Sequence, residues 1–313
     1  MKHKFIYIFL AAAVCITALS GCTKVNEEIP DVTEAVTEEE PQPYPVTIGS
    51  LVFNSAPETV ASLSPAVTEI IAELGFEDKL TGRSVYCDYP ESIESIRELG
   101  SAANPDVDAI KEAAPQLLIS HSPIAKKDIT EIESAGTRVL IISAPSSVDE
   151  LYGLYANIYR LFNGADGGEE AALNERFAPL EAAFEEHSGM LGSYVYVMSK
   201  DLAVASDSTF AGDLLSRFGT NAAAEESGNA VTKERLLELD PEYIILSRSV
   251  KKSRLPEGLT AVAEGRVLRF DSETEALLER PTSRISLAAD DLAEKIKAAA
   301  ETPSETSETA AAE

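Results

Sequence analysis

The sequence predicts an α/β fold in which two lobes, each with a central and largely parallel sheet, are joined by one long helix and enclose a ligand cleft. Three observations indicate this fold. Buried strands alternate with helices along most of the 313 residues, which is typical of βαβ units and of a sheet covered on both faces. Strand–helix runs of similar pattern lie on both sides of one long helical stretch. A helix–proline–strand pattern also occurs once in each half.

The long helical stretch runs from Gly168 to His187, with apolar residues at helical spacing and glutamates on the other faces. At 1.5 Å per residue it spans about 30 Å, roughly the width of a small domain. We therefore expect it to be the backbone between the lobes; the alternative is a surface helix of one larger domain. Pro179 lies inside the pattern, removes a backbone donor and is expected to kink or split the helix.

The amino-terminal segment is predicted to be a targeting signal. Basic residues precede an apolar run from Phe5 to Leu19, which is too short for a membrane span of about 20 residues. Ser20-Gly21-Cys22 follows and resembles the lipobox of bacterial lipoproteins. We expect lipid on Cys22, so that acyl chains hold the protein at the membrane outside the cytoplasm, on the cell surface or the periplasmic side. An ordinary secretory signal is the alternative.

The chain contains three cysteines. Cys15 would leave with the signal and Cys22 would carry lipid, so Cys87 would remain alone and no intrachain disulfide could form. We expect Cys87 to be a small packed residue rather than a metal ligand, because no second cysteine is left to complete a site. The fold must then be held by its hydrophobic core without covalent cross-links.

The distribution of acidic residues distinguishes the two ends of the chain from the part predicted to fold, and the net charge argues against some partners. Residues 22–48 and 301–313 are rich in acidic residues, and the first of these segments also contains several prolines, which predicts a self-repelling tether and a disordered tail. The whole chain has 53 acidic and 26 basic residues, for a formal charge of −27. This balance argues against binding nucleic acid or lying flat on anionic lipid.

The predicted boundaries follow from these composition changes and from the connector. They are a signal peptide at 1–21, a tether at 22–48, an amino-terminal lobe at 49–165, an interlobe helix at 166–189, a carboxyl-terminal lobe at 190–300 and a tail at 301–313.

The elements of the lobes are predicted from caps and apolar runs. Ser64 before Pro65 is a cap and first-turn pair that opens a helix ending at Gly75. In order, the predicted strands lie at 59–63, 80–85, 117–119, 138–142 and 194–198, and the predicted helices at 66–74, 107–114, 129–135 and 148–162, with a further helix from 209 to 219.

The two halves resemble each other most in one pattern. VDAIKEAAPQLLISHS begins at Val107, and VTKERLLELDPEYIILSRS begins at Val231. Aligning the strands matches His121 with Arg248. Because ligands bind beyond the carboxyl ends of strands in open α/β sheets, these two side chains are predicted to face one cleft from opposite walls. A chance match of two helix–strand units is the alternative.

Five motifs carry a resemblance to a known family: SLSPAVTEIIAELG, the YCDYP loop, NPDVDAIKEAAPQLLIS, STFAGDLLSRFGTNAA and RPTSR. From about Glu58 to Ile296 the chain resembles the helical-backbone (class III) substrate-binding proteins of ABC importers, which capture vitamin B12, ferric siderophores and haem. The vitamin B12-binding members look closest because of the YCDYP loop, although those members line the cleft with tryptophan and this chain has none. The resemblance implies a monomeric carrier that closes slightly on its ligand and works with permease and ATPase subunits.

The resemblance also assigns roles to residues. It implies permease-docking carboxylates at Glu69 and Glu234, one on each lobe, each of which would meet an arginine of the permease. It places Tyr86 at the cleft, where the ring could stack on a flat ligand. The internal repeat adds His121 and Arg248 as ligand contacts, the latter with a guanidinium suited to carboxylate or phosphate. Arg83 is a further candidate for the cleft.

Several ligands and functions remain open. A corrinoid is favoured, with haem as the alternative because Tyr86 and His121 are both possible donors to iron. A ferric siderophore would call for more basic groups than Arg248 and Arg83. A zinc or manganese receptor is not expected, since only His121 and His187 remain after the signal, too few for a multi-histidine site. No resident metal or cofactor is expected. No nucleophile elbow, P-loop or HExxH pattern indicates an enzyme. A surface lipoprotein with no transport role is the remaining alternative.

Overall fold

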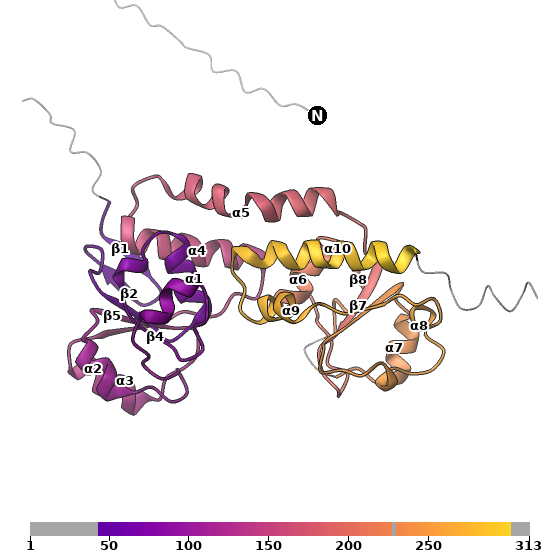
Figure 1. Ribbon diagram of the computed structural model, residues 1–313, viewed down its shortest axis with the longest axis horizontal. Coiled ribbons are helices and arrows are strands. Elements are labelled where there is room, and N and C mark those ends of the chain that lie inside the picture. The colour runs from indigo at the N-terminus through magenta and orange to yellow at the C-terminus, as the bar shows by residue number, and fades with distance from the viewer. Residues whose placement is uncertain (1–42, 227–229, 302–313) are drawn as a thin grey trace, which may run out of the picture. The chain divides into compact units, whose positions relative to one another are not determined.

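The computed structural model describes residues 43–226 and 230–301 (Figure 1). The predicted signal at 1–21, the lipid site at Cys22 and almost all of the predicted tail lie outside the described residues. Two four-stranded sheets, one in each half, confirm the predicted α/β fold class.

The amino-terminal sheet has the order β4-β3-β5-β6, and every pair of neighbouring strands is parallel. Its strands are β3 (Val60–Ser62), β4 (Leu80–Arg83), β5 (Leu117–Ser120) and β6 (Arg138–Ile141), and its helices are α1 (Pro65–Glu73), α2 (Val107–Ala113), α3 (Lys126–Ser134) and α4 (Val148–Asn163), with short 3-10 turns η1 (Glu77–Lys79) and η2 (Glu91–Ser95).

The carboxyl-terminal sheet has the order β10-β9-β7-β8 and is also parallel throughout. Its strands are β7 (Ser193–Val197), β8 (Thr220–Asn221), β9 (Tyr243–Leu246) and β10 (Val267–Leu268); the helices of this half are α6 (Phe210–Ser216), α7 (Lys233–Leu239), α8 (Thr260–Ala263), α9 (Ser272–Glu279) and α10 (Ser286–Glu301), with 3-10 turns η3 (Lys252–Arg254) and η4 (Ser283–Ile285).

The predicted end of the tether at residue 48 is wrong, because a hairpin begins at Val46. Strands β1 (Val46–Ile48) and β2 (Leu51–Phe53) pair antiparallel, and Val46 and Ile48 are buried in the main core. Gly49 takes a φ of +56° at the turn, where a side chain would be strained. Two strands of three residues beside an acidic, proline-rich segment are too short to stand out as a pattern. The folded part therefore begins by Val46, inside the segment that was expected to be tether.

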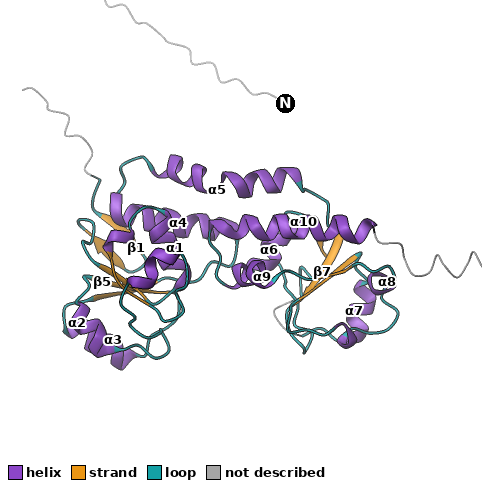
Figure 2. Ribbon diagram, in the orientation of Figure 1, coloured by secondary structure: helices purple, strands orange, loops and turns teal. Residues whose placement is uncertain are grey.

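The helix expected between the lobes is present as α5 (Glu169–Glu186), and Pro179 lies within its continuous span. The helix follows α4 and precedes β7, so it joins the two halves in sequence, and it packs against α4 and α10 (Figure 2). Phe177 is buried and its ring meets the rings of Tyr152 and Tyr155 at centroid distances of 4.3 and 4.8 Å. This apolar face explains why the helix forms despite its proline and its many glutamates.

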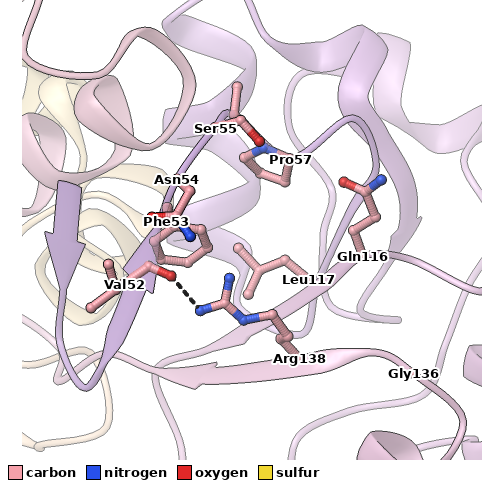
Figure 3. Close-up of a pocket in the computed structure, with 10 residues that line it drawn as sticks. Val52, Phe53, Asn54, Ser55, Pro57, Gln116, Leu117, Gly136 and Arg138 are labelled. Carbon is pink, nitrogen blue, oxygen red and sulfur yellow. Dashed lines mark hydrogen bonds between the residues drawn. The ribbon is translucent and has the colours of Figure 1, made fainter. Parts of the chain in front are cut away.

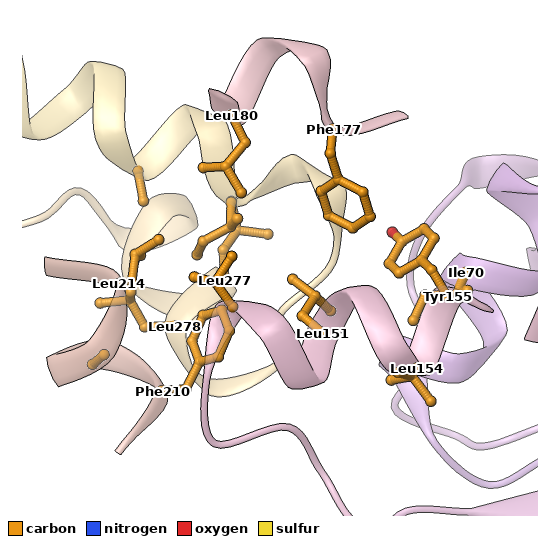
Figure 4. Packing of buried hydrophobic residues seen from close by; sticks show 14 of the residues in the cluster. Ile70, Leu151, Leu154, Tyr155, Phe177, Leu180, Phe210, Leu214, Leu277 and Leu278 are labelled. Carbon is orange, nitrogen blue, oxygen red and sulfur yellow. The ribbon is translucent and has the colours of Figure 1, made fainter. Parts of the chain in front are cut away.

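The main core contains residues of both halves. Leu151 and Leu154 of α4 lie in it with Leu180 of α5, Phe210 of α6 and Leu277 of α9 (Figure 4). Two smaller clusters pack other faces of the two sheets. Among residues 43–226 and 230–301, no helix combines the length and the apolarity that crossing a bilayer requires. The shared core fixes helices such as α1 and α4, which begin after the carboxyl ends of β3 and β6. The candidate site lies at this edge of the sheet.

Candidate functional site

A pocket of about 210 Å³ lies where strands β3 and β5 of the amino-terminal sheet end. This is the edge of a parallel sheet at which α/β proteins bind ligands. One wall comes from the start of α1, and another comes from the segment that follows α9 in the carboxyl-terminal half. The lining residues are Leu63, Ser64, Pro65, Ala66, His121, Ser122, Ala144, Glu279, Arg280 and Pro281.

Strands β5 and β9 both end in a turn in which the N–H of one serine donates to the hydroxyl of the serine two positions before it; β3 ends in such a turn as well. Ser120 donates its hydroxyl to the Ser122 carbonyl at 2.8 Å and accepts the Ser122 N–H at 3.2 Å. In the other half, Ser249 donates its N–H to the Ser247 hydroxyl at 3.3 Å, and the two hydroxyls lie 3.1 Å apart. These turns support the strand alignment made from sequence. The middle residues of the two turns are therefore equivalent in position.

His121 is the middle residue of the first turn, and it lines the pocket as expected. Burial lowers the pKa of its imidazole to about 4, because the charged form is poorly solvated there. The ring is therefore neutral at physiological pH. Its Nε2 is buried and has no hydrogen-bond partner within the described residues. A neutral nitrogen without a partner is available to a ligand group or to a metal carried by a ligand.

Arg248, the middle residue of the second turn, is not among the pocket residues. Its side chain is exposed, its guanidinium donates to the Ser272 hydroxyl, and its backbone N–H donates to the Glu275 carboxylate at 3.1 and 3.2 Å. Both partners belong to α9. The structure thus places Arg248 at the carboxyl end of β9, as predicted, with its side chain held by its own half.

Tyr86 has the exposure expected of a ligand contact. It lies in the segment Ser84–Pro90, which we call the Tyr86 loop, and 67% of the residue is exposed. Its backbone N–H donates to the Ser84 hydroxyl at 3.3 Å. A large aromatic ring left in water on a constrained loop is suited to stacking on a flat ligand.

Arg83 does not have the expected role. The residue is 7% exposed, and its guanidinium donates to the carbonyls of Ser84, Cys87 and Glu94 at 3.1 to 3.2 Å. It also pairs with Glu98 at 3.1 Å. The guanidinium of Arg83 is thus occupied by bonds that hold the Tyr86 loop and the segment after it. The expectation that Arg83 lines the cleft is therefore wrong.

Glu69 is also placed differently from the expectation. An exposed docking carboxylate was predicted, whereas the residue is 2% exposed on the inner face of α1. It accepts a hydrogen bond from the Thr282 hydroxyl at 2.6 Å and lies 3.5 Å from the Arg284 guanidinium. Burial raises the pKa of this carboxyl, and the Thr282 bond partly offsets that shift. A buried side chain cannot meet an arginine of another protein, so Glu69 is unsuited to docking.

Glu234 is exposed in the first turn of α7, as expected for docking. Its counterpart in the other half is Asp108 of α2, whose side chain is 93% exposed. Both helices have seven residues, an N-cap side chain two positions before the acid, and a left-handed C-cap before a proline. The sequence pattern that matched these helices could have identified Asp108, but the match was used only at the strand ends.

Arg280 is the site residue that sequence reasoning missed. It lines the pocket, and its guanidinium forms a fork with the Asp88 carboxylate at 2.5 and 3.3 Å. Its Nε is buried without a partner in the described part of the chain. The RPTSR motif was noticed in the sequence, but its contacts cross 192 residues and cannot be inferred from spacing. Arg280 joins the pocket of His121 to the loop of Tyr86.

A second hollow, of about 350 Å³, lies at the opposite ends of the strands. Its lining includes Gln116 and Leu117 at the start of β5 and Arg138 at the start of β6 (Figure 3). Arg138 donates to the Val52 carbonyl at 2.8 Å and lies over the Phe53 ring. The amino ends of parallel strands are not the usual ligand edge. Among the described residues, no group of three His, Cys, Asp or Glu side chains is placed to hold a metal ion.

Comparison with known proteins identifies the family. A periplasmic binding protein family matches residues 60–274. The chain belongs to this family. This periplasmic binding protein is 24% identical over 318 residues to an uncharacterized ABC transporter substrate-binding lipoprotein of Bacillus subtilis, covering 92% of the chain and 96% of the relative. It is 24% identical over 256 residues to a cobalamin-binding protein of Halobacterium salinarum, covering 75% and 68%.

A solved structure agrees with the fold. The periplasmic vitamin B12-binding protein of Vibrio cholerae superposes with a TM-score of 0.58 at 21% identity, over 79% of this chain and 99% of the other. The resemblance inferred from the motifs is therefore confirmed at the level of family and fold. The assignment of individual residues to ligand and permease stays a prediction.

Proposed function

We propose that this protein is the substrate-binding lipoprotein of an ABC importer, and that it captures a corrinoid and delivers it to the membrane permease. The observation that carries this proposal is the family match across both sheets, which supports taking the pocket at the strand ends as the ligand site. A lipoprotein and a cobalamin-binding protein among the relatives support the anchor and the ligand class. Export and lipid anchoring are consistent with the predicted signal and Cys22.

A corrinoid suits the side chains at the site. The exposed Tyr86 ring offers a stacking face for a flat macrocycle. His121 and Arg280 border the pocket and offer polar groups to the amide side arms of such a ligand. With no tryptophan in the chain, stacking depends on tyrosine, and we expect a weaker apolar contribution than a tryptophan-lined cleft would give.

Haem is the second candidate, and His121 favours it. Its imidazole is neutral, and its Nε2 has no partner among the described residues. Neutral imidazole and tyrosine are both common donors to haem iron. The same pocket could therefore receive an iron macrocycle in place of a corrinoid, and a ferric siderophore is a third possibility.

Calorimetry separates these ligands. The purified protein is titrated with cobinamide, cyanocobalamin, hemin and a panel of ferric siderophores. We expect a dissociation constant in the nM–µM range for one class, corresponding to roughly −12 to −8 kcal/mol. A Soret band that is lost in His121→Ala or Tyr86→Ala favours haem. If no ligand gives heat or a thermal shift, the import proposal fails.

For docking, we propose the pair Asp108 and Glu234 in place of Glu69 and Glu234. Both acids are exposed at the same place in equivalent helices of the two halves. Glu234 also borders a hollow of about 640 Å³ that could receive a permease loop. Exposed carboxylates of this kind steer and orient a partner bearing arginines more than they add affinity.

The docking proposal is tested by reversing charge. We expect Asp108→Arg with Glu234→Arg to abolish ligand uptake by cells while ligand binding by the purified protein stays normal. Glu175→Arg with Glu185→Arg, on exposed positions of α5, is the control with the same net charge, and it should leave uptake intact. Normal uptake by the Asp108/Glu234 variant would exclude this pair.

A further inference from the structure

The Tyr86 loop is held by side chains on more than one side, although the Tyr86 ring itself is exposed. Arg83 donates to the carbonyl of Ser84 at the start of the loop, to that of Cys87 in its middle and to that of Glu94 beyond it. Cys87 is buried and lies 3.2 Å from the Thr68 hydroxyl of α1. These contacts come from the amino-terminal half and would be expected in any ordered loop.

The other contacts come from the far end of the sequence. Arg280 forks onto Asp88, and the Arg284 guanidinium lies 3.8 Å from the centroid of the Tyr89 ring. Fork-shaped pairs between arginine and carboxylate fix orientation as well as distance. Asp88 and Tyr89, the two residues directly after Cys87, are thus held by residues that follow α9. We call Arg280, Thr282 and Arg284 the clamp.

The clamp is itself fixed to the helices around it. Thr282 is fully buried and donates to Glu69 at 2.6 Å, and Arg284 pairs with Glu69 at 3.5 Å and with Glu273 at 3.0 Å. Between them, Ser283 donates its backbone N–H to the Tyr155 hydroxyl at 2.7 Å. Helices α1, α4 and α9 therefore all set the position of the clamp.

The ion pair that joins the clamp to the loop is partly exposed to solvent. Side chains of Arg280 and Asp88 are 29% and 64% exposed. An ion pair this exposed contributes little to the stability of the whole protein. Its geometric effect on the loop is therefore separable from its effect on folding.

We propose that Arg280, with Asp88, is a positioning pair that holds the Tyr86 loop in its ligand-binding conformation. This rests on the proposed function only in taking Tyr86 as a ligand contact. A loop that is already ordered binds without the entropy loss of ordering it, so the clamp raises affinity without having to touch the ligand. The role of Arg284 is to hold the Tyr89 side of the same loop.

The first test needs no ligand. The chain has no tryptophan, so Tyr86→Trp places a single fluorescent reporter on the loop. Time-resolved anisotropy of this variant is compared with and without Asp88→Asn or Arg280→Gln. Each substitution is expected to increase local motion, the two together no more than either alone, and Arg280→Lys is expected to give an intermediate result. Urea unfolding checks that stability is unchanged.

Arg97→Gln is the matched control. It breaks the exposed ion pair between Arg97 and Glu112, whose nitrogen and oxygen lie 2.6 Å apart. This pair lies in the same half of the protein but does not contact the Tyr86 loop. Anisotropy of the reporter should not change. If Asp88→Asn also leaves the reporter as immobile as before, or if the effects of Asp88→Asn and Arg280→Gln simply add, the positioning role is excluded.

The second test measures affinity for cobinamide and for hemin with Tyr86 in place. Asp88→Asn should weaken binding of the accepted probe roughly three- to tenfold through lost preorganisation. Arg280→Gln should weaken binding at least as much, because Arg280 also lines the pocket. Asp88→Asn should then cause no further loss of affinity in the Arg280→Gln background. Neither Asp88 nor Tyr86 is among the residues that line the pocket, so the non-additivity of the two substitutions is what separates lost preorganisation from lost ligand contact. If the loop becomes more mobile in the variants but the parent protein binds neither probe, the positioning role is supported and the proposed ligand class is contradicted. If the loop becomes more mobile but affinity is unchanged, the clamp does not contribute to binding.

Discussion

At the scale of single residues, burial decides which charged groups are available to other molecules. Glu69 and Glu234 are both helix glutamates, yet the first is 2% exposed and the second is an exposed residue. The sequence around Glu69 reads as an ordinary amphipathic helix. Its carboxylate is nevertheless buried, and Thr282, 213 positions later, donates a hydrogen bond that offsets part of the cost of burial. Local pattern cannot reveal a partner at that distance.

Because Glu69 is buried and Glu234 is exposed, we expect alanine at these two positions to change the free energy of unfolding by different amounts. Glu69→Ala leaves the Thr282 hydroxyl and the Arg284 guanidinium without their shared acceptor, and we expect a loss of about 1–3 kcal/mol in the free energy of unfolding. Glu69→Gln keeps an acceptor oxygen and should lose less. Glu234→Ala, on the surface, should lie within about 0.5 kcal/mol of the parent. Urea unfolding measures all three; equal effects of alanine at positions 69 and 234 would contradict the burial of Glu69.

His121 predicts a pH dependence of stability. Its pKa is about 4 in the folded protein and near 6.5 in an unfolded chain. Between these values the unfolded chain binds a proton that the folded protein does not, so this group makes the protein less stable as pH falls from 6.5 to 4 and adds no further loss below 4. The full shift corresponds to at most roughly 3 kcal/mol.

The measurement compares urea unfolding of the parent and of His121→Gln at pH 7, 5.5 and 4.5. The difference between the two proteins removes the contribution of the many carboxylates. We expect the variant to gain relative to the parent as pH falls. A constant difference across this range would mean that the imidazole is not shielded from water as the structure shows.

At the scale of elements, caps and apolar runs in the sequence predicted most of the framework. Ser64 accepts the Val67 N–H at 3.4 Å and Pro65 takes the first helical position, as expected. The parallel strands of the amino-terminal half and the connector α5 were also predicted within a few residues. The sequence did not predict the short hairpin β1–β2 or the buried role of Arg83, since both depend on packing against distant elements rather than on local periodicity. The short strands β8 and β10 and the helices α8, α9 and α10 were not predicted either.

Pro179 is an exposed residue within α5, which nevertheless continues through it. Replacing it by alanine restores a backbone donor and removes a steric conflict with the preceding turn, so we expect Pro179→Ala to raise the free energy of unfolding by about 1–3 kcal/mol. Glu175→Ala on the same exposed face should change it by less than about 0.5 kcal/mol.

Small-angle scattering of Pro179→Ala, with and without the ligand identified by calorimetry, tests whether the proline also affects motion between the lobes. If Pro179 concentrates bending, the variant should show a smaller change in radius of gyration on binding than the parent. Identical scattering in both states would leave the proline with no role in closure.

At the scale of the whole molecule, the amino-terminal half depends on residues that come much later in the sequence. The amino-terminal half contains Glu69, Glu73 and Tyr155, and all three are bonded to Thr282 or Ser283, close to the carboxyl terminus. A chain ending at residue 279 lacks these partners. We expect it to lose cooperative unfolding and to bind a hydrophobic dye, whereas a chain ending at residue 301 should unfold like the parent.

The bonds made by Thr282 and Ser283 have a consequence for biogenesis. Although the amino-terminal half comes first in the sequence, its last buried bonds form only after residue 283 has been added and brought back to α1. Chain elongation at about 5–20 residues per second separates the end of α4 from this segment by several seconds or more. Throughout that interval the half carrying Tyr86 remains incomplete, and a chaperone or an export factor that holds unfinished chains would find its target there.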